Sequence, residues 1–155
     1  MTGLDQLKAD ASSRREENAA LSIAYSKTLA WLMPANFLLV IGAALLSLVA
    51  GATILIETNL LSKISSGVLA LVSSAFTIIH SKLGCEQYQA ECKKLRSFHR
   101  GMASDYSNLL SIDEVDEFKR RLTALNDQVS ATMKSTTALP FESALIAAKK
   151  HHGDV

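Results

Sequence analysis

The sequence predicts an all-α membrane protein, in which a two-helix transmembrane hairpin is joined to a cytoplasmic helical module that is antiparallel and coiled-coil-like. Three observations predict this fold class. Charged residues are absent from residues 28–56 and 64–79, although the chain has 16 Lys and Arg and 15 Asp and Glu. After these stretches, apolar residues recur at alternating steps of three and four, the spacing of one helix face. The alternation typical of strands is absent from the sequence.

The overall content of 48% apolar residues averages two different regimes, a charge-free part and a normally charged part. This division argues against a disordered tail, a disulfide-rich secreted scaffold and a soluble domain with evenly spread hydrophobicity. The net charge of +1 indicates no nucleic-acid partner. We expect an N-terminal cytoplasmic helix over 1–27, the transmembrane hairpin over 28–80 and a cytoplasmic helical region over 81–155.

The first 27 residues are expected to be helical. Ser13 and Glu16 match the spacing of a capping box, and a short helix around Leu4 and Leu7 precedes it. No Gly or Pro interrupts the chain between Ser13 and Pro34. The helix that begins near Ser13 is therefore expected to run into the membrane.

The first membrane span is predicted over 37–56. A helix rises 1.5 Å per residue, so that about 20 apolar residues cross a hydrocarbon core of about 30 Å. Trp31, Pro34 and Asn36 suit the membrane interface or the first helical turn. Two alternatives are a buried core helix of a soluble protein and a signal peptide, but the latter fits poorly because the run is long and follows a charged segment.

The second span is predicted over 60–80 and is less apolar, because it contains several Ser residues and Thr77. A re-entrant or interfacial helix is the alternative. Spanning is favoured because a lone first span would place the two charged ends of the chain on opposite sides. The short polar connection at 57–59 would make the two spans antiparallel neighbours.

Positively charged residues set the expected orientation. Four precede the first span and five follow the second, whereas only Lys63 lies between them. The positive-inside rule places both termini in the cytoplasm of a multi-pass protein of the inner (plasma) membrane. The flanking residues are Lys8, Arg14, Arg15, Lys27, Lys82, Lys93, Lys94, Arg96 and Arg100.

Both spans carry small residues at four-residue spacing, which lets membrane helices approach closely. Packing within one hairpin and packing between protomers of a homo-oligomer both remain open, as does simple tolerance of Ser and Ala in these helices. The helix-packing and assembly candidates are Ala43, Ser47 and Gly51 in the first span, and Ser62, Ser66, Ala70 and Ser74 in the second.

A heptad pattern follows the second span, and it predicts that the membrane helix continues for about 30 residues into the cytoplasm with one face covered. A second cytoplasmic helix begins near Ser111 and Glu114, which form another capping-box match. The two are expected to form an antiparallel pair, and Pro140 is expected in the first turn of a last short helix. The heptad face comprises Cys85, Tyr88, Cys92, Leu95, His99, Met102, Tyr106 and Leu109.

The sequence contains no catalytic signature. The glycines form no phosphate-binding loop, and motifs of metalloproteases, redox CxxC proteins and α/β-hydrolases are absent. We therefore expect no enzyme, no cofactor and no metal site. Cys85 and Cys92 are expected to be thiols, with oxidation across a dimer seam as the alternative, and His99 is expected to pack rather than to sense protons.

This arrangement resembles the SLATT family, the two-transmembrane effector domains associated with SMODS nucleotidyltransferases and SLOG sensors. The resemblance rests on the apolar hairpin over 29–79, on the stretch YQAECKKLRSFHRGMASDYSNLL, and on the ending LPFESALIAAKK. It covers nearly the whole chain. It implies an antiviral defence effector of a prokaryotic conflict system, which oligomerises and perforates or depolarises the inner membrane when a nucleotide-linked partner triggers it.

We expect no attached sensor or synthase domain like that of larger SLATT proteins, so the resemblance implies a separately encoded nucleotide synthase or sensor as partner, beside the lipid bilayer. Two other functions remain open. One is a membrane-anchored scaffold whose cytoplasmic helices recruit a partner without pore activity. The other is a holin-like protein, although holins usually have less cytoplasmic mass.

Overall fold

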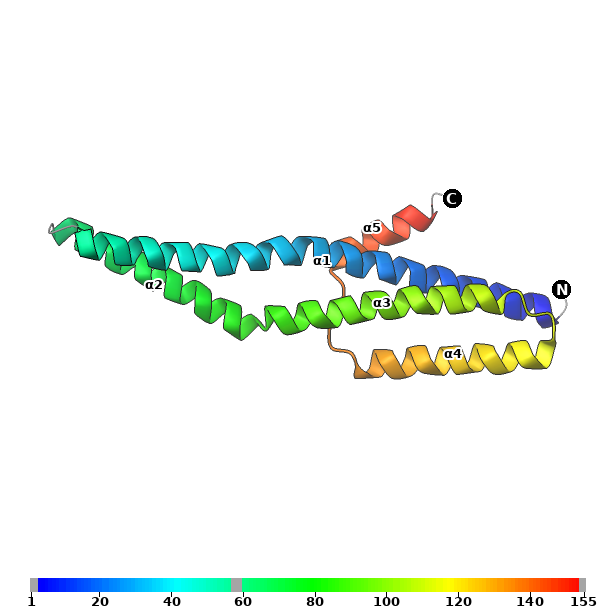
Figure 1. The fold of residues 1–155 in the computed structure, drawn as a ribbon. Helices are drawn as coiled ribbons and strands as arrows, with labels where there is room; N and C mark the ends of the chain where they lie inside the picture. Colours follow the sequence, from blue (N-terminus) through cyan, green and yellow to red (C-terminus); the bar gives the residue numbers. More distant parts are fainter. Residues whose placement is uncertain (1–2, 57–59, 154–155) are drawn as a thin grey trace. The chain divides into compact units, whose positions relative to one another are not determined.

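The computed structural model describes the backbone of residues 3–56 and 60–153, and the side chains of these residues outside 54–65, 80–83 and 151–153. All regular structure in the described part of the chain is helical, as predicted. The helices are α1 (Gly3–Ile56), α2 (Leu60–Leu83), α3 (Cys85–Leu109), α4 (Val115–Ser135) and α5 (Glu142–Gly153), shown in Figure 1. The predicted tight connection at 57–59 lies outside the described residues.

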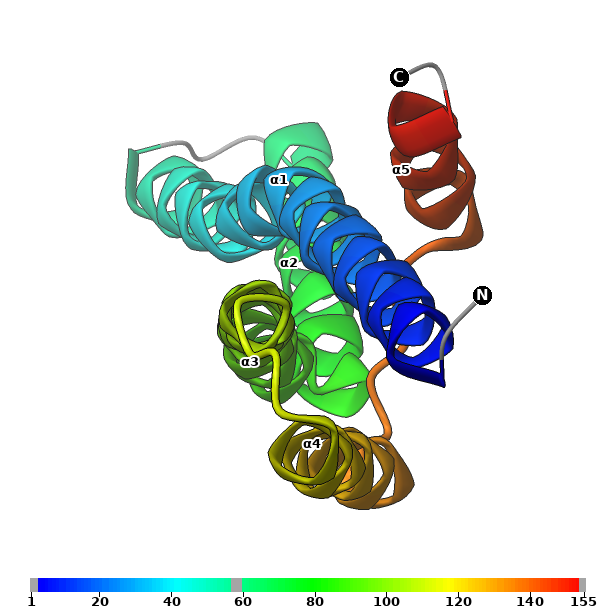
Figure 2. The same ribbon diagram turned by 90° about the vertical axis from the view of Figure 1, so that its right-hand side faces the viewer.

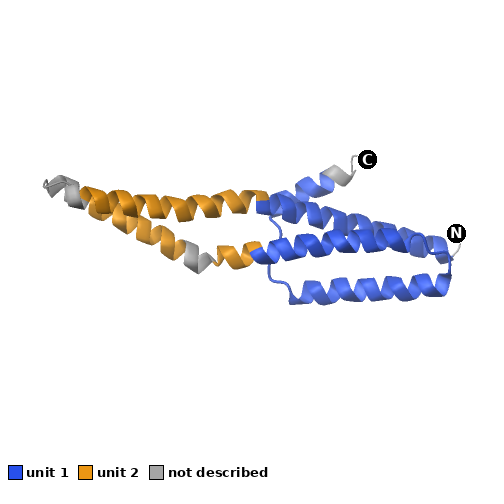
Figure 3. Ribbon diagram, in the orientation of Figure 1, with its two compact units in different colours: residues 1–29, 90–155 blue, residues 30–89 orange. Residues whose placement is uncertain are grey.

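The chain divides into two compact units (Figure 3). Unit 1 comprises residues 1–29 and 90–155, and unit 2 comprises residues 30–89. The beginning of α1 thus belongs with α3, α4 and α5, although the sequence suggested a separate N-terminal helix.

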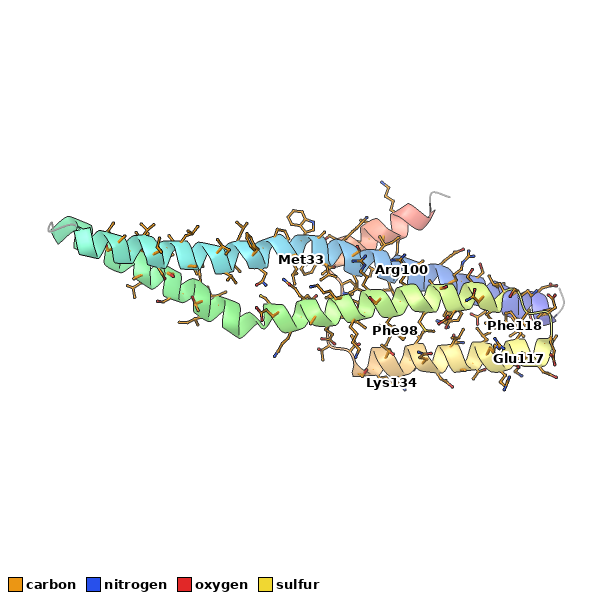
Figure 4. The ribbon with its side chains drawn as sticks, viewed as in Figure 1. Met33, Phe98, Arg100, Glu117, Phe118 and Lys134 are labelled. Carbon is orange, nitrogen blue, oxygen red and sulfur yellow. The ribbon has the colours of Figure 1, made fainter. Side chains whose placement is uncertain are left out.

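Unit 1 is organised around α3. Its apolar core consists of Ala11 from α1, Phe118 and Leu122 from α4, and residues of α3 that include Met102, Tyr106 and Leu109. The expected antiparallel pair of α3 and α4 is therefore incomplete, because the N-terminal part of α1 covers α3 as well. In Figure 4, Phe118 lies on the side of α4 that faces the other helices, and its side chain is fully buried.

Helix α5 packs on another side of α1, where Ala148 and Leu145 contact Ala20 and Ala24. Figures 1 and 2 both show α4 and α5 on opposite sides of α1 within unit 1. Because the contact residues are mostly Ala, the two helices approach closely.

The segment between α4 and α5 is held by three hydrogen-bonded contacts with α1 and α3. The Glu91 carboxylate accepts hydrogen bonds from the backbone N–H and the hydroxyl of Thr137, at 2.9 and 3.0 Å. The Tyr25 hydroxyl donates to the Ala138 carbonyl at 3.0 Å, and Thr28 Oγ1 accepts from the Phe141 N–H at 3.0 Å. The hydrogen bonds from Thr137 hold the pKa of Glu91 below its usual value.

Unit 2 is built from the second part of α1, from α2 and from the beginning of α3. Helices α1 and α2 are antiparallel, because Ser47 contacts Ser73 while the later Thr53 contacts the earlier Ser66. Pro34 lies inside α1 rather than in a first turn. The Gln89 side chain donates a hydrogen bond to the Leu32 carbonyl at 3.0 Å, close to the turn of α1 that the proline ring weakens.

Both predicted capping boxes are wrong. Ser13 and Glu16 lie in the interior of α1, so they cap nothing, and Leu4 and Leu7 belong to the same helix. Helix α4 begins at Val115 after Glu114, which makes no capping hydrogen bond with its side chain. The Ser111 hydroxyl donates instead to the Asn108 carbonyl at 2.7 Å.

Further along the chain, Pro140 precedes α5 by two residues, because this helix begins only at Glu142. The predicted uninterrupted helix from the second apolar stretch into the heptad stretch is also wrong. It is broken at Gly84, whose φ of +56° lies in the left-handed region.

The break at Gly84 predicts that alanine substitutions at two glycines of the chain change the stability in opposite directions. An alanine at position 84 has space, because the nearest atom to an added Cβ is 3.6 Å away, but it would retain the unfavourable φ. We expect Gly84→Ala to destabilise the protein by about 1 kcal/mol. Gly101 lies inside α3, and in the described part of the chain no atom beyond its neighbours and the local helix backbone lies within 4 Å of an added Cβ. Gly101→Ala is therefore expected to stabilise it by about 0.5–1 kcal/mol.

Denaturant unfolding in detergent, followed by far-ultraviolet circular dichroism, measures both changes. Equal stabilisation by the two substitutions would contradict a left-handed break at position 84.

Candidate functional site

Two features of the structure are candidates for function: the contact between α1 and α2 in unit 2, and a polar cluster in the core of unit 1. The first is a seam of small and hydroxyl side chains, formed by Ala43, Ser47, Ala50, Thr53, Ser66 and Ser73. Ser47 Oγ and Ser73 Oγ are 2.6 Å apart, and Ser73 Oγ also donates to the Ala43 carbonyl at 2.7 Å. Thr53 Oγ1 and Ser66 Oγ are 2.5 Å apart.

The seam includes only part of the predicted helix-packing set. Ala43 and Ser66 are buried and Ser47 is hydrogen-bonded across the seam, whereas Gly51, Ala70 and Ser74 are exposed on the outside of the pair. The side chain of Ser62 lies outside the described part. A step of four residues turns a helix side chain by 40° beyond a full turn, so a strict four-residue row leaves the contact face after two steps. Ala50, Thr53 and Ser73 take part because the seam uses steps of three as well as four.

Large apolar side chains surround this seam and are exposed. Trp31 is 77% exposed, Leu38 and Leu48 are each 70% exposed, and Leu71 is 72% exposed. Among the described residues, α1 is the one helix long and apolar enough to cross a membrane, over Gly3–Thr53, and only 6% of its most apolar window is buried. The described apolar run of α2, Ser66–Ile79, is shorter.

A core helix of a soluble protein is mostly buried, so this exposure argues against that alternative for α1. Soluble monomers rarely expose large contiguous apolar patches. The long apolar helix α1 is weak evidence for membrane association.

The heptad face of α3 forms the centre of unit 1. Cys92, Leu95, His99, Met102, Tyr106 and Leu109 are buried, whereas Cys85 and Tyr88, which belong to unit 2, are partly exposed. Cys85 and Cys92 are both in the thiol form. This face contacts α1 and α4 within the same chain.

His99 is the most polar member of this face and is 0% exposed. Its Nδ1 lies 2.8 Å from Asn18 Oδ1, and the Asn18 amide donates to the Arg14 carbonyl at 2.8 Å. The imidazole stacks on the ring of Tyr25, with centroids 5.8 Å apart and planes 9° apart, and the ring of Phe98 meets it edge-on. Burial lowers the pKa of His99, and the nearby Glu17 carboxylate opposes this effect.

Tyr106 lies one heptad further along α3 and is also 0% exposed. Its hydroxyl donates to Asn126 Oδ1 on α4 at 2.7 Å, and burial raises its pKa. A cavity of about 290 Å³ lies beside His99 and Tyr106, lined by residues of α1, α3 and α4. The sequence reasoning did not identify Asn18, Tyr25 and Asn126 as parts of this cluster.

The sequence nevertheless contains a pattern that identifies two of these residues, Asn18 and Tyr25. Ala11, Asn18 and Tyr25 are spaced by seven and belong to a stripe with the same alternating steps as α3. Asn18 and Tyr25 face α3 because they lie on that stripe.

The described part of the chain contains no group of three or more His, Cys, Asp or Glu side chains suited to hold a metal ion. The chain matches no protein-family model, and no significant match was found among curated proteins or solved structures.

The burial of His99 predicts a pH-dependent stability. Because its pKa in the folded state lies below the ordinary 6.5, the unfolded chain binds more protons below that pH. Stability is therefore present above pH 6.5 and is lost as the pH falls from 6.5 through the lower folded-state pKa. We expect denaturant midpoints of the full chain in detergent to fall between about pH 7 and pH 5.5, and to fall less in His99→Gln.

The pKa values of Asp113 and Glu117 are lowered by hydrogen bonds from Lys8 and from Arg121 and Arg120, so these carboxylates affect stability at lower pH. The other histidines are common to both proteins and cancel in the comparison. Parallel pH profiles for the two proteins would contradict the assignment to His99.

Proposed function

We propose that this protein is a membrane effector of a prokaryotic anti-phage conflict system, which assembles as a homo-oligomer and perforates or depolarises the inner membrane. The observation that supports this best is the exposed apolar surface of unit 2 around a hydrogen-bonded seam. A nucleotide-linked partner, encoded separately, acts as the trigger. The trigger and the biological role rest on the resemblance to the SLATT family.

Lipid is the solvent that suits the outer surface of unit 2. Exposed Leu, Val, Ile and Phe side chains gain from hydrocarbon, while the hydroxyls of Ser47, Ser73 and Thr53 are hydrogen-bonded between the two helices. An unsatisfied polar group in hydrocarbon is costly, so closing these hydroxyls inward stabilises the pair in a bilayer. Trp31 suits the membrane interface. Under this proposal, α1 and α2 are the two transmembrane helices of the hairpin.

Assembly requires a second surface, since the seam is used within the chain. Gly51, Ala70 and Ser74 provide small residues on the outside of the pair, where helices of another copy can approach closely. Among the described residues, no atom beyond the chain neighbours and the local helix backbone lies within 4 Å of a Cβ placed on Gly51. We assign lateral packing between copies to this outer face, defined by Gly51, Ala70 and Ser74.

The membrane-anchored scaffold is the second candidate. It is favoured by the pairing of the seam hydroxyls within one chain, because hydroxyls that hydrogen-bond to one another do not line an open path for ions. In that case unit 1 would recruit a partner, and permeability would not change.

Substitution of the outer face separates the two functions. We expect Gly51→Leu to reduce depolarisation of expressing cells at least tenfold, because a larger side chain separates neighbouring copies. Ala52→Leu is the matched control, since it adds a similar volume to the next, equally exposed position and should keep activity. Dye influx and membrane potential are measured with the chain alone and with its neighbouring genes, after membrane insertion has been verified for each variant.

Equal activity of both variants would exclude Gly51 from assembly. Absence of depolarisation by the inserted wild-type protein under every condition would overturn the effector and leave the scaffold.

Topology is tested at Cys85, which is partly exposed, whereas Cys92 is fully buried. In a Cys92→Ser protein, we expect a membrane-impermeant maleimide to label Cys85 in inverted membrane vesicles and not in intact spheroplasts. Detergent-solubilised protein serves as the control for reactivity. Labelling in intact spheroplasts would refute the cytoplasmic location of the region after α2.

A further inference from the structure

Unit 2 contains a groove that is apolar along α1 and polar on the side of α2 and α3. Its volume is about 340 Å³, and all of the described residues that line it belong to unit 2. Helix α1 contributes Leu39, Val40 and Ala44 to the lining, whereas Thr77 of α2 and Glu86 of α3 contribute polar groups. Thr77 and Glu86 are both exposed, so a ligand can reach them.

The hydroxyl hydrogens at this groove are already used within the helix pair. Thr77 Oγ1 donates to the Ser73 carbonyl at 3.1 Å, and Ser73 Oγ donates to the Ala43 carbonyl at 2.7 Å. Because a hydroxyl carries one hydrogen, the Ser47 hydroxyl must be the donor in its 2.6 Å contact with Ser73 Oγ. The hydroxyls that line the groove can therefore only accept further hydrogen bonds.

Glu86 adds a negative charge to these acceptors. Its carboxylate makes no hydrogen bond or ion pair with any other residue in the described part of the chain. An ionised carboxylate also only accepts hydrogen bonds, whereas a primary ammonium group has three donors and no acceptor. The polar lining of the groove thus suits an ammonium group, and its apolar lining suits a hydrocarbon chain.

The polar and apolar parts lie in the order in which a lipid presents its headgroup and its chain. Ser47 pairs with Ser73, so Leu39 lies about two turns from this pair toward the beginning of α1. The lining by α1 thus extends for about 12 Å, from Leu39 to Ser47. Glu86 lies beyond the end of α2, which is the side of the cytoplasmic headgroups in the proposed orientation.

We propose that this groove binds a phospholipid with a primary amine in its headgroup, whose ammonium pairs with Glu86 while an acyl chain lies along Leu39, Val40 and Ala44. The primary ammonium donates charge-assisted hydrogen bonds to the carboxylate, whereas a quaternary ammonium has the same charge but no N–H group. This inference rests on the proposed membrane location of unit 2, and it does not require pore formation.

Phosphatidylethanolamine and phosphatidylcholine form a matched pair of probes, because they differ only in the methylation of the amine. Each probe carries the same photoactivatable diazirine in its acyl chain and is a minor component of phosphatidylcholine vesicles that contain the full chain. After irradiation, mass spectrometry locates the cross-linked residues. We expect the ethanolamine probe to label residues 39–47 about tenfold more than the choline probe. Leu71, which is exposed and does not line the groove, should be labelled equally by both.

Two pairs of variants locate the headgroup and the chain. Glu86→Gln should lower the labelling by the ethanolamine probe to that of the choline probe, whereas Glu142→Gln, the same change in the first turn of a helix of unit 1, should keep the preference. Ala44→Phe should fill the groove and reduce the labelling of residues 39–47 by both probes. Ala52→Phe is its control, since Ala52 is also exposed on α1 but does not line the groove.

Equal labelling of residues 39–47 by the two probes would overturn the proposal, and so would an undiminished preference in Glu86→Gln. Labelling of Leu71 in these cases would show that unit 2 is in the bilayer, so that only the lipid site fails. If neither probe labels α1 or α2 at any position, the membrane location of unit 2 and the lipid site are both wrong.

Discussion

The inward face of α3 requires cover from more than one helix, and this requirement organises the whole of unit 1. The face presents Leu95, His99, Met102 and Tyr106, which alternate between apolar and polar character and are all buried. The hydrogen bond from His99 to Asn18 joins α3 to α1, and the one from Tyr106 to Asn126 joins α3 to α4. A single facing helix would leave one of these polar groups unpaired, at a cost of about 1–3 kcal/mol.

Unit 2 is held together by a different kind of contact. Unit 1 relies on large side chains that exclude water, whereas the seam in unit 2 consists of Ala, Ser and Thr, with hydroxyls paired across it. Small residues and hydrogen bonds are what stabilise helix pairs where lipid removes the hydrophobic driving force, at about 1 kcal/mol or less per pair. Both kinds of contact occur along α1, which contributes residues to both units.

Periodicity predicted the helices, and the buried face of α3 follows the expected heptad closely. What periodicity did not supply was the partner of that face. Ala11, Asn18 and Tyr25 share its spacing, but Ala and Asn carry too little hydrophobicity to mark a core stripe by composition. Spacing was also insufficient to predict a helix start at Ser13. Ser13 and Glu16 have the spacing of a capping box, but no Gly or Pro near Ser13 ends the helix that precedes it. Gly84 was present in the sequence, but one glycine inside a helical pattern does not by itself specify a positive φ.

The small residues of the two apolar stretches show what residue spacing alone can and does not predict about helix packing. Their four-residue rows identified helices suited to close packing, but such a row winds around its helix. Ala43 and Ser66 therefore lie in the seam, while Gly51 and Ser74 lie outside it. The predicted set thus divides into residues that lie in the contact of one helix pair and residues that are exposed on its outside. A protein that only anchored its soluble part would need the first group and not the second, which is why the outer face distinguishes an assembling effector from a scaffold.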